Sequence, residues 1–120
     1  MDSSYQSLPV LDPARRALRD HVLQHSLKTG SFTLKSGAKS SWFLDTKQTA
    51  CRADGVLLMA DVALSIIPGD VVAIGGLTMG ADPVAYGIAA VAATRGRDLR
   101  SFSVRKEAKD HGVTGRIAGA

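Results

Sequence analysis

Apolar residues recur every three or four positions near the start of the chain. Four of them define one face of a predicted helix: Leu11, Ala14, Leu18 and Val22. Asp12 followed by Pro13 predicts the helix start, because aspartate accepts the free amide hydrogens and proline has none to lose. Gly30 ends the pattern, so we expect the helix to run to about residue 27. Residues 1–10 lack periodicity and predict a frayed terminus.

Two short extended runs, 32–35 and 42–45, lie on either side of the polar segment 36–41. Gly37 gives this segment the backbone freedom that a tight turn needs. The arrangement predicts a β-hairpin directly after the first helix.

The second half of the sequence alternates helix and strand patterns. We expect a helix at 54–67, an apolar strand at 71–74, a helix at 84–94 and a strand at 100–104. A strand, a helix and a strand in this order predict a right-handed unit with two parallel strands. The expected fold class is therefore α/β, with helices flanking a parallel sheet.

Composition narrows the class of protein. The 120 residues suffice for one domain, and 45% hydrophobic with only 5% aromatic residues suits the aliphatic interior of a helix-covered sheet. The net charge of +4 permits nucleic-acid binding, but the cations are scattered and not interleaved with aromatics, so we expect no nucleic-acid partner. The single cysteine, Cys51, excludes an intrachain disulfide. No apolar run approaches about 20 residues, so we expect a cytoplasmic protein without membrane association.

A cluster of charged residues follows the last predicted strand. Four of its side chains donate hydrogen bonds to anionic oxygens: Arg105, Lys106, Lys109 and His111. Guanidinium binds phosphate bidentately and ammonium acts as a point charge, so these donors suit a polyphosphate. The absence of apolar periodicity predicts a mobile loop over 105–112, and we expect 105–120 to be poorly ordered without ligand. A solvated surface loop without function is the alternative.

A glycine-rich run, 75–80, follows the other predicted parallel strand. Both this run and the basic loop would leave the carboxyl ends of parallel strands, which is the edge where open α/β sheets bind ligands. The start of the following helix presents amide hydrogens suited to an anion. A tight strand-to-helix turn is the alternative.

His21 and His25 lie one turn apart on the first predicted helix, a spacing that suits a metal ion. The sequence shows neither a third ligand nor a group of carboxylates beside them. We therefore predict no metal site there.

Three motifs together resemble the orotate phosphoribosyltransferase family of type I phosphoribosyltransferases. They are FTLKSG at 32–37, IGGLTMGADP at 74–83 and RKEAKDHG at 105–112, in the family's order and approximate spacing. The resemblance extends from about Leu18 onward. It implies a single, incomplete phosphoribosyltransferase domain over 1–120, with a helix-and-hairpin hood in 1–50 and the first part of the α/β core in 51–120.

The resemblance implies transfer of phosphoribosyl from phosphoribosyl pyrophosphate to orotate, with Mg²⁺, giving orotidine 5′-monophosphate and pyrophosphate in pyrimidine (UMP) biosynthesis. In the family the hairpin borders the orotate ring, a role that falls here on Phe43 and Leu44. The lysine of the FTLKSG motif, Lys35, reaches the ligand. The basic loop extends into the neighbouring subunit's site, so a homodimer is implied.

The same resemblance assigns the pyrophosphate contacts. The glycine-rich turn would bind through the backbone amides of Leu77, Thr78, Met79 and Gly80, since the lysine that some members carry there is absent. The leaving group would be bound by Arg105 and stabilised by three catalytic residues: Lys106, Lys109 and His111. His111 would also donate a proton to it.

One motif of the family has no match in this sequence. Members continue into a strand that ends in two adjacent acids and a Thr- and Gly-rich turn, which hold the ribose hydroxyls and the 5-phosphate. We therefore expect the 120 residues alone to lack transferase activity, and the two parallel strands to lack neighbours at their edges. A noncatalytic module that binds a phosphoribosyl nucleotide or a pyrimidine, or a regulatory relative, is the alternative.

Overall fold

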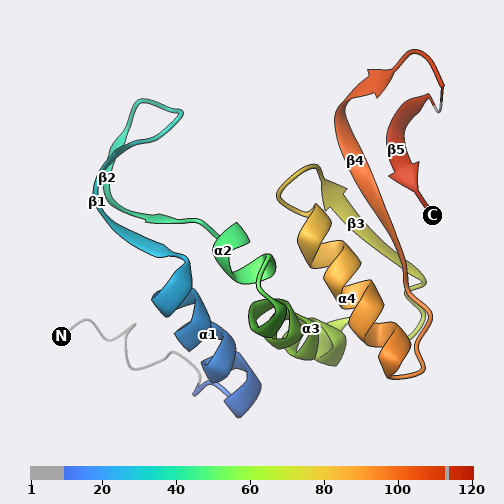
Figure 1. Cartoon of the computed structure of the whole chain (residues 1–120), viewed down its shortest axis with the longest axis horizontal. Helices are drawn as coiled ribbons and strands as arrows, with labels where there is room; N and C mark the ends of the chain where they lie inside the picture. The colour runs from blue at the N-terminus through green and yellow to red at the C-terminus, as the bar shows by residue number, and fades with distance from the viewer. Residues whose placement is uncertain (1–9, 113) are drawn as a thin grey trace.

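The chain folds into two parts joined by a short helix (Figure 1). The first part is helix α1 with the β1–β2 hairpin, and the second is helices α3 and α4 against the sheet of β3, β4 and β5. The structure, a computed structural model, describes residues 10–112 and 114–120. The frayed terminus expected at 1–10 falls mostly on residues 1–9, which lie outside the described residues.

Helix α1, Pro13–His25, begins as the sequence predicts. The side chain of Asp12 accepts a hydrogen bond from the backbone amide of Arg15 at 2.8 Å, which satisfies one of the free donors of the first turn. This bond also lowers the pKa of the Asp12 carboxyl. The helix ends two residues earlier than expected, because Leu27 pairs with Leu44 as the first residue of β1.

The predicted hairpin is confirmed, with longer strands than expected. Strands β1, Leu27–Thr33, and β2, Lys39–Leu44, pair antiparallel with an irregularity between Thr29 and Phe32. Gly37 closes the turn with φ +86°, a conformation that favours glycine. Its amide donates to the carbonyl of Leu34 at 2.9 Å. We call this element the hood hairpin.

Two helices form the core of the second part. Helix α3, Ala53–Ile66, and helix α4, Asp82–Thr94, match the predicted ones, whereas the four-residue helix α2, Lys47–Ala50, was not predicted. The buried core is aliphatic: Ala60, Ile88, Val91, Ala92 and Leu99. Helix α4 contacts α3 on one side and both β3 and β4 on the other, so its position fixes how the sheet meets the helices.

The sheet is mixed rather than wholly parallel, which corrects the expected topology. Strands β3, Ala73–Leu77, and β4, Arg100–Lys109, run parallel, as predicted, with Gly75 opposite Phe102. Strand β5, Gly115–Gly119, adds antiparallel to the outer side of β4. Strand β3 also begins two residues later than expected and includes Gly75 and Gly76, so these glycines belong to a strand and not to a turn.

The expectation of a loop after residue 104 is wrong for most of that segment, whereas the expected lack of order without ligand stays a prediction. Strand β4 continues to Lys109, and Val104 pairs with Ile117 of β5. The edge of β4 carries unpaired backbone groups that a returning segment can satisfy, and this pairing does not require apolar periodicity. Among the described residues after 104, those outside the strands are 110–112, 114 and 120.

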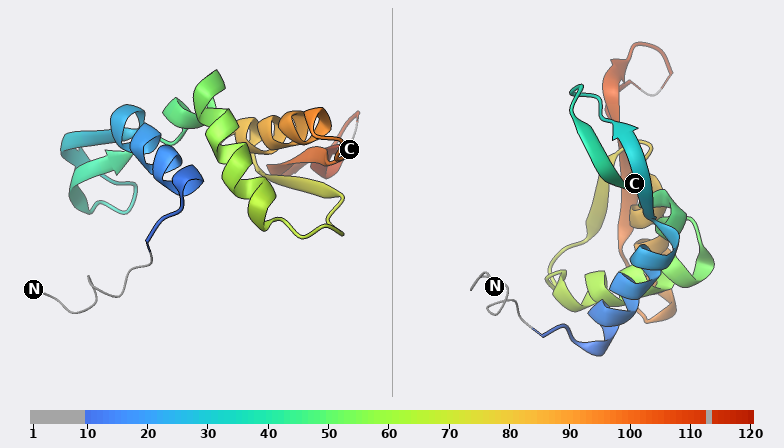
Figure 2. Two further views of the ribbon diagram at one scale, coloured as in Figure 1. Left: turned by 90° about the horizontal axis from the view of Figure 1, so that it is seen from below. Right: turned by 90° about the vertical axis from the view of Figure 1, so that its left-hand side faces the viewer.

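The molecule is extended for its length. Its radius of gyration is 17.1 Å and its principal extents are 55 × 39 × 27 Å, whereas a compact domain of this length has a radius of gyration of about 14 Å. The hood hairpin stands away from the sheet (Figure 2), and among the described residues no strand pairs with the outer edge of β3. Val72 and Leu77 beside this edge are 69% and 59% exposed. We expected both parallel strands to lack a neighbouring strand at their outer edges. Within the described residues this is so for β3, whereas it is wrong for β4, which pairs with β5.

The contact between α3 and α4 leaves no room for a side chain at Gly87. A Cβ there would lie 2.1 Å from Cγ2 of Val56. We predict that Gly87→Ala lowers the free energy of unfolding by roughly 1–3 kcal/mol, because overpacking outweighs the better helix propensity of alanine. Urea denaturation of the chain measures this loss.

A second substitution tests whether the stability loss of Gly87→Ala comes from the contact with Val56. Val56→Ala removes the opposing methyl groups, so the double variant should lose less stability than the two single variants together. Gly69→Ala is the matched control, since nothing lies within 4 Å of a Cβ at Gly69. Additive losses in the double variant would show that the two helices do not meet at this point.

Candidate functional site

The hood hairpin carries a hollow of about 400 Å³ lined by Phe32, Thr33, Leu34, Lys35 and Phe43. The rings of Phe32 and Phe43 lie with their centroids 6.0 Å apart, a geometry typical of tilted aromatic pairs. Lys35 follows β1 at the mouth of the turn. The structure thus brings together two residues predicted for one ligand, Lys35 and Phe43.

Leu44 does not share this hollow. It lies at the end of β2, where it pairs with Leu27 at the base of the hairpin near α1. Its predicted place beside a flat ligand ring stays a prediction. Phe32, whose ring faces Phe43, was not predicted as a site residue. Its position in the FTLKSG motif, three residues before Lys35, is the signal that was available.

The turn between β3 and α4, residues 78–81, has fewer free amides than the sequence suggested. The amide of Thr78 donates to the carbonyl of Val104 at 3.0 Å, which joins the end of β3 to β4. Leu77 is the last residue of β3. For the amides of Met79 and Gly80 the described residues provide no acceptor. Of the four amides predicted to bind an anion, that of Thr78 is therefore engaged within the sheet.

Asp82 holds this turn against the sheet. Its carboxylate accepts a hydrogen bond from Oγ of Ser103 at 2.6 Å and one from Oγ1 of Thr78 at 2.5 Å. These two bonds, that from Ser103 first, lower the pKa of the Asp82 carboxyl. The hydroxyl of Tyr86 also hydrogen-bonds Oγ of Ser103. Asp82 was not predicted as a site residue. The four-residue spacing from Thr78 across the turn was the signal that sequence reasoning missed.

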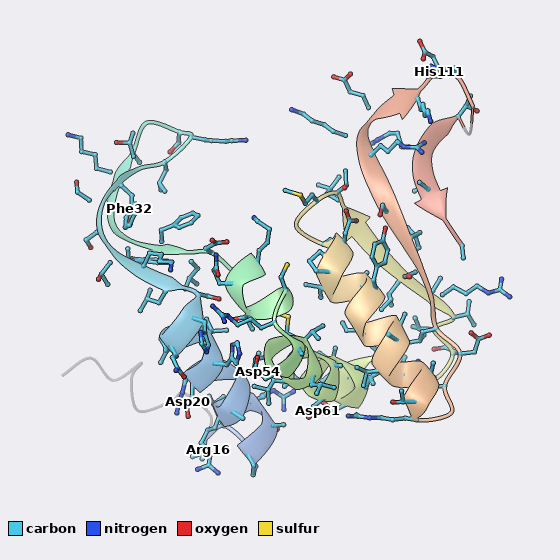
Figure 3. All side chains as sticks on the ribbon, in the orientation of Figure 1. Arg16, Asp20, Phe32, Asp54, Asp61 and His111 are labelled. Carbon is cyan, nitrogen blue, oxygen red and sulfur yellow. The ribbon has the colours of Figure 1, made fainter. Side chains whose placement is uncertain are left out.

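The basic residues lie on the outer half of β4 and in the turn that follows it. Arg105 is held within the β4–β5 hairpin, because Nη1 donates to the carbonyl of Gly115 at 3.2 Å. Its own carbonyl accepts from Nε of Arg116 at 3.0 Å. Lys106 and Lys109 are exposed, and they have no ion-pair partner among the described residues. His111, near the tip of the hairpin in Figure 3, contacts Asp110 with Nδ1 2.9 Å from the carboxylate.

These three features lie on one side of the molecule, where Thr78 of the turn bonds Val104 of β4 but the hood hairpin stands apart. The hood hairpin, the 78–81 turn and the β4–β5 hairpin all point the same way (Figures 1 and 2). Among the described residues, however, β1 and β2 make no contact with β4 or β5. Lys35 and Phe43 are therefore separate from Lys106, Lys109 and His111. The side chains form two half-sites on one side rather than one closed pocket.

Metal ligands are not gathered on this side. Within the described part of the chain, the group of three histidine or carboxylate ligands consists of His21, His25 and Asp54, between α1 and α3. In addition, no helix of the described residues is long and apolar enough to cross a membrane.

The low pKa of Asp82 gives a pH dependence with a definite sign. An aspartate whose pKa is lowered by folding stabilises the folded chain above its unfolded value of 3.8, and this contribution is lost as the pH falls through the folded pKa. We predict that Asp82→Asn destabilises the chain at pH 6 and narrows the difference in stability between pH 6 and pH 3. Urea midpoints at the two pH values measure this.

Asp98→Asn is the control for charge, because it removes a carboxylate from an exposed loop residue that has no hydrogen-bond partner among the described residues. Equal pH dependence in the wild type and in Asp82→Asn would show that the Thr78 and Ser103 bonds do not stabilise the ionised carboxylate.

Known proteins are similar to this chain in both sequence and fold. No family model matches it. The orotate phosphoribosyltransferase of Nostoc sp. is 39% identical over 105 residues, covering 88% of this chain and 51% of the relative. That of Streptomyces avermitilis is 38% identical over 110 residues, covering 91% and 60%. The chain thus spans about half the length of the curated relatives it matches.

Solved structures agree with this relationship. Mycobacterium tuberculosis orotate phosphoribosyltransferase in complex with Fe(III) dicitrate superposes with a TM-score of 0.72 at 34% identity, over 90% of this chain and 61% of that one. The complex of the same enzyme with 5-phospho-α-D-ribosyl 1-diphosphate gives a TM-score of 0.66 at 28% identity, over 90% and 57%. The helix, the hood hairpin and the α/β core are therefore shared with these enzymes. By sequence and by fold, the chain belongs to the orotate phosphoribosyltransferase family.

Proposed function

We propose that this chain supplies the orotate-binding and pyrophosphate-binding faces of an orotate phosphoribosyltransferase. The reaction joins orotate to phosphoribosyl pyrophosphate and releases orotidine 5′-monophosphate and pyrophosphate. The single observation that carries the proposal is the placement of an aromatic hollow with a lysine and an exposed basic hairpin on one side of the molecule. The names of the relatives and the complex of the Mycobacterium tuberculosis enzyme support the choice of substrates.

The hood hollow suits a flat, negatively charged ring. Phe43 offers an aromatic face and Lys35 offers an ammonium at the same hollow. A carboxylate on the ligand would pair with the ammonium, while the ring excludes water from one face of the ligand. In this assignment Lys35 and Phe43 bind the orotate base. Leu44 supports the hairpin at its base, where it pairs with Leu27.

The basic hairpin suits the charge that develops on the leaving group. As the bond between the anomeric carbon and pyrophosphate breaks, negative charge accumulates on the departing oxygens. Lys106 and Lys109 are exposed cations that stabilise this charge more in the transition state than in the ground state. Arg105 is partly engaged by Gly115, so we assign it to shaping the hairpin as well as to binding phosphate. His111 is the candidate proton donor.

The described residues do not form a protein cage for the expected Mg²⁺. No three carboxylate or imidazole ligands come together beside the 78–81 turn or the basic hairpin within the described part of the chain. Mg²⁺ commonly binds through substrate phosphates and water. We propose that Mg²⁺ arrives with the phosphoribosyl pyrophosphate, and no contribution of the residues above depends on it.

We propose further that the enzyme is a homodimer whose basic hairpin completes the neighbouring subunit's site. The supporting observation is that the hood strands and the basic hairpin of one chain do not contact each other. A projecting hairpin can bring Lys106 and Lys109 to a base held by the partner's hood. The second candidate function, a noncatalytic module that binds a pyrimidine or a phosphoribosyl nucleotide, would use the same two faces without turnover.

The leaving-group role of Lys106 can be measured in a chimera. In the chimera this chain replaces the matching residues of the Streptomyces avermitilis enzyme. The rest of that enzyme supplies the remaining family segments. We predict that Lys106→Ala in the chimera lowers kcat by about 10²- to 10³-fold with a smaller change in KM for orotate. Lys35→Ala should instead raise KM for orotate by roughly tenfold or more, since it removes a charged hydrogen bond to the bound base.

Lys39→Ala is the matched control, because Lys39 is an exposed lysine of the same hood hairpin that does not line the hollow. A chimera that binds orotate and phosphoribosyl pyrophosphate without releasing pyrophosphate would favour the binding module. Equal losses of kcat and of orotate affinity in Lys106→Ala would assign this lysine to ground-state binding.

The isolated chain should not catalyse the transfer reaction. Its half-sites do not meet, and no segment of its sequence offers the paired acids that hold the ribose hydroxyls in the family. We predict no measurable pyrophosphate release when the purified 120 residues receive orotate, phosphoribosyl pyrophosphate and Mg²⁺. The intact Streptomyces avermitilis enzyme is the positive control. Turnover of the isolated chain at a comparable rate would mean that the ribose phosphate is held by residues assigned here to structure.

A further inference from the structure

A buried histidine with an unpartnered nitrogen lies between α1 and α3, away from the proposed substrate faces. His21 is 7% exposed, and its Nε2 has no hydrogen-bond partner among the described residues. Nε2 lies 3.1 Å from Oδ1 of Asp54, a distance typical of an ion pair but without the angles of a hydrogen bond. A buried polar atom left in this state is costly unless another group satisfies it.

His25 brings a third ligand to the same point. It follows His21 by one turn of α1, and the two ring centroids are 4.4 Å apart. One ligand atom from each of His21, His25 and Asp54 lies within 4.8 Å of the other two. Ligands of a tetrahedral zinc ion with bonds near 2.0 Å are roughly 3.3 Å apart, so small side-chain rotations would close this set around a metal. Figure 3 shows Asp54 where α1 and α3 approach each other.

The other ring nitrogen of His21, Nδ1, is held by a hydrogen bond, as is usual for histidines that bind a metal through Nε2. Nδ1 lies 3.1 Å from Oγ1 of Thr49, which in turn lies 2.6 Å from Oγ of Ser26. Thr49 and Ser26 are fully buried. A proton on Nδ1, donated to Thr49, leaves the lone pair of Nε2 directed toward the other two ligands. Gly55 allows the close approach of α3, since a Cβ there would lie 2.8 Å from Cε1 of His21.

We propose that His21, His25 and Asp54 bind one divalent transition-metal ion of the zinc type, with water completing the coordination. Two imidazoles and one carboxylate are a ligand set that zinc accepts, and a magnesium ion would prefer oxygen ligands. The ion joins the last turn of α1 to the first turn of α3. It therefore fixes the hood to the α/β core at a point distinct from the proposed substrate faces.

Zinc titration of the 120-residue chain, read by competition with a chromophoric chelator, tests the proposal. We expect one zinc per chain, a rise in melting temperature on zinc addition, and reversal by chelator. His25→Ala should weaken zinc binding by at least about 10²-fold, and Asp54→Asn by at least about tenfold. His111→Ala and Cys51→Ser remove potential ligands outside the cluster and should leave the affinity unchanged. Absence of stoichiometric binding, or equal affinity in His25→Ala, would overturn the proposal.

A measurement on the wild-type chain guards against variants that fail to fold. Co²⁺ in place of zinc should give the intense visible bands of a four-coordinate site and should broaden the NMR amide signals of Gly55 and its neighbours first. Broadening centred on residues 105–112 would place the ion on the basic hairpin instead. A structural ion pair of His21 and Asp54 with no metal function predicts no Co²⁺ bands and no change in melting temperature.

Discussion

The packing of α4 between α3 and the β3–β4 pair is the constraint on which the rest of this structure depends. Its buried residues are small or aliphatic, with Ala85 and Ala92 allowing close approach and Ile88 and Val91 filling the space. Burial of each larger side chain contributes roughly 1.5–3 kcal/mol. Because α4 starts directly after the 78–81 turn, this packing also fixes where the amides of that turn lie. The turn and the sheet are then joined by Asp82.

A second, polar junction holds the hood. The buried side chains of Ser26, Thr49 and His21 form a chain of hydrogen bonds between the end of α1 and α2. The carboxylate of Asp54 on α3 lies 3.1 Å from Nε2 of His21. Hydrogen bonds of this kind are directional, so they set orientation more strictly than apolar contact does. The hood therefore meets the core through a small oriented joint rather than through a broad apolar interface. A metal ion at this joint would tighten it without altering either substrate face.

The division of the candidate site follows from these two junctions. The core presents the 78–81 turn and the basic hairpin, and the hood presents the aromatic hollow with Lys35. Within one chain the two faces share a side but not a contact. This separation explains why we propose a partner subunit and further family segments for turnover. It also explains the large radius of gyration, because the hood has no second surface of the described chain to pack against.

The sequence by itself determined the elements whose signals are local. The Asp12–Pro13 start of α1, the Gly37 turn and the apolar patterns of α3 and α4 depend on neighbouring residues, and each is where the pattern placed it. The three motifs also indicated the family. The sequence did not determine the pairing of β5 with β4, because an exposed strand with glycines at both ends has no apolar period and forms only when a partner edge is present. Tertiary structure alone likewise decided the hydrogen bond of Asp82 with Ser103 and the contact of His21 with Asp54. The first pair is separated by 21 positions and the second by 33, so each pair meets only after the helices pack.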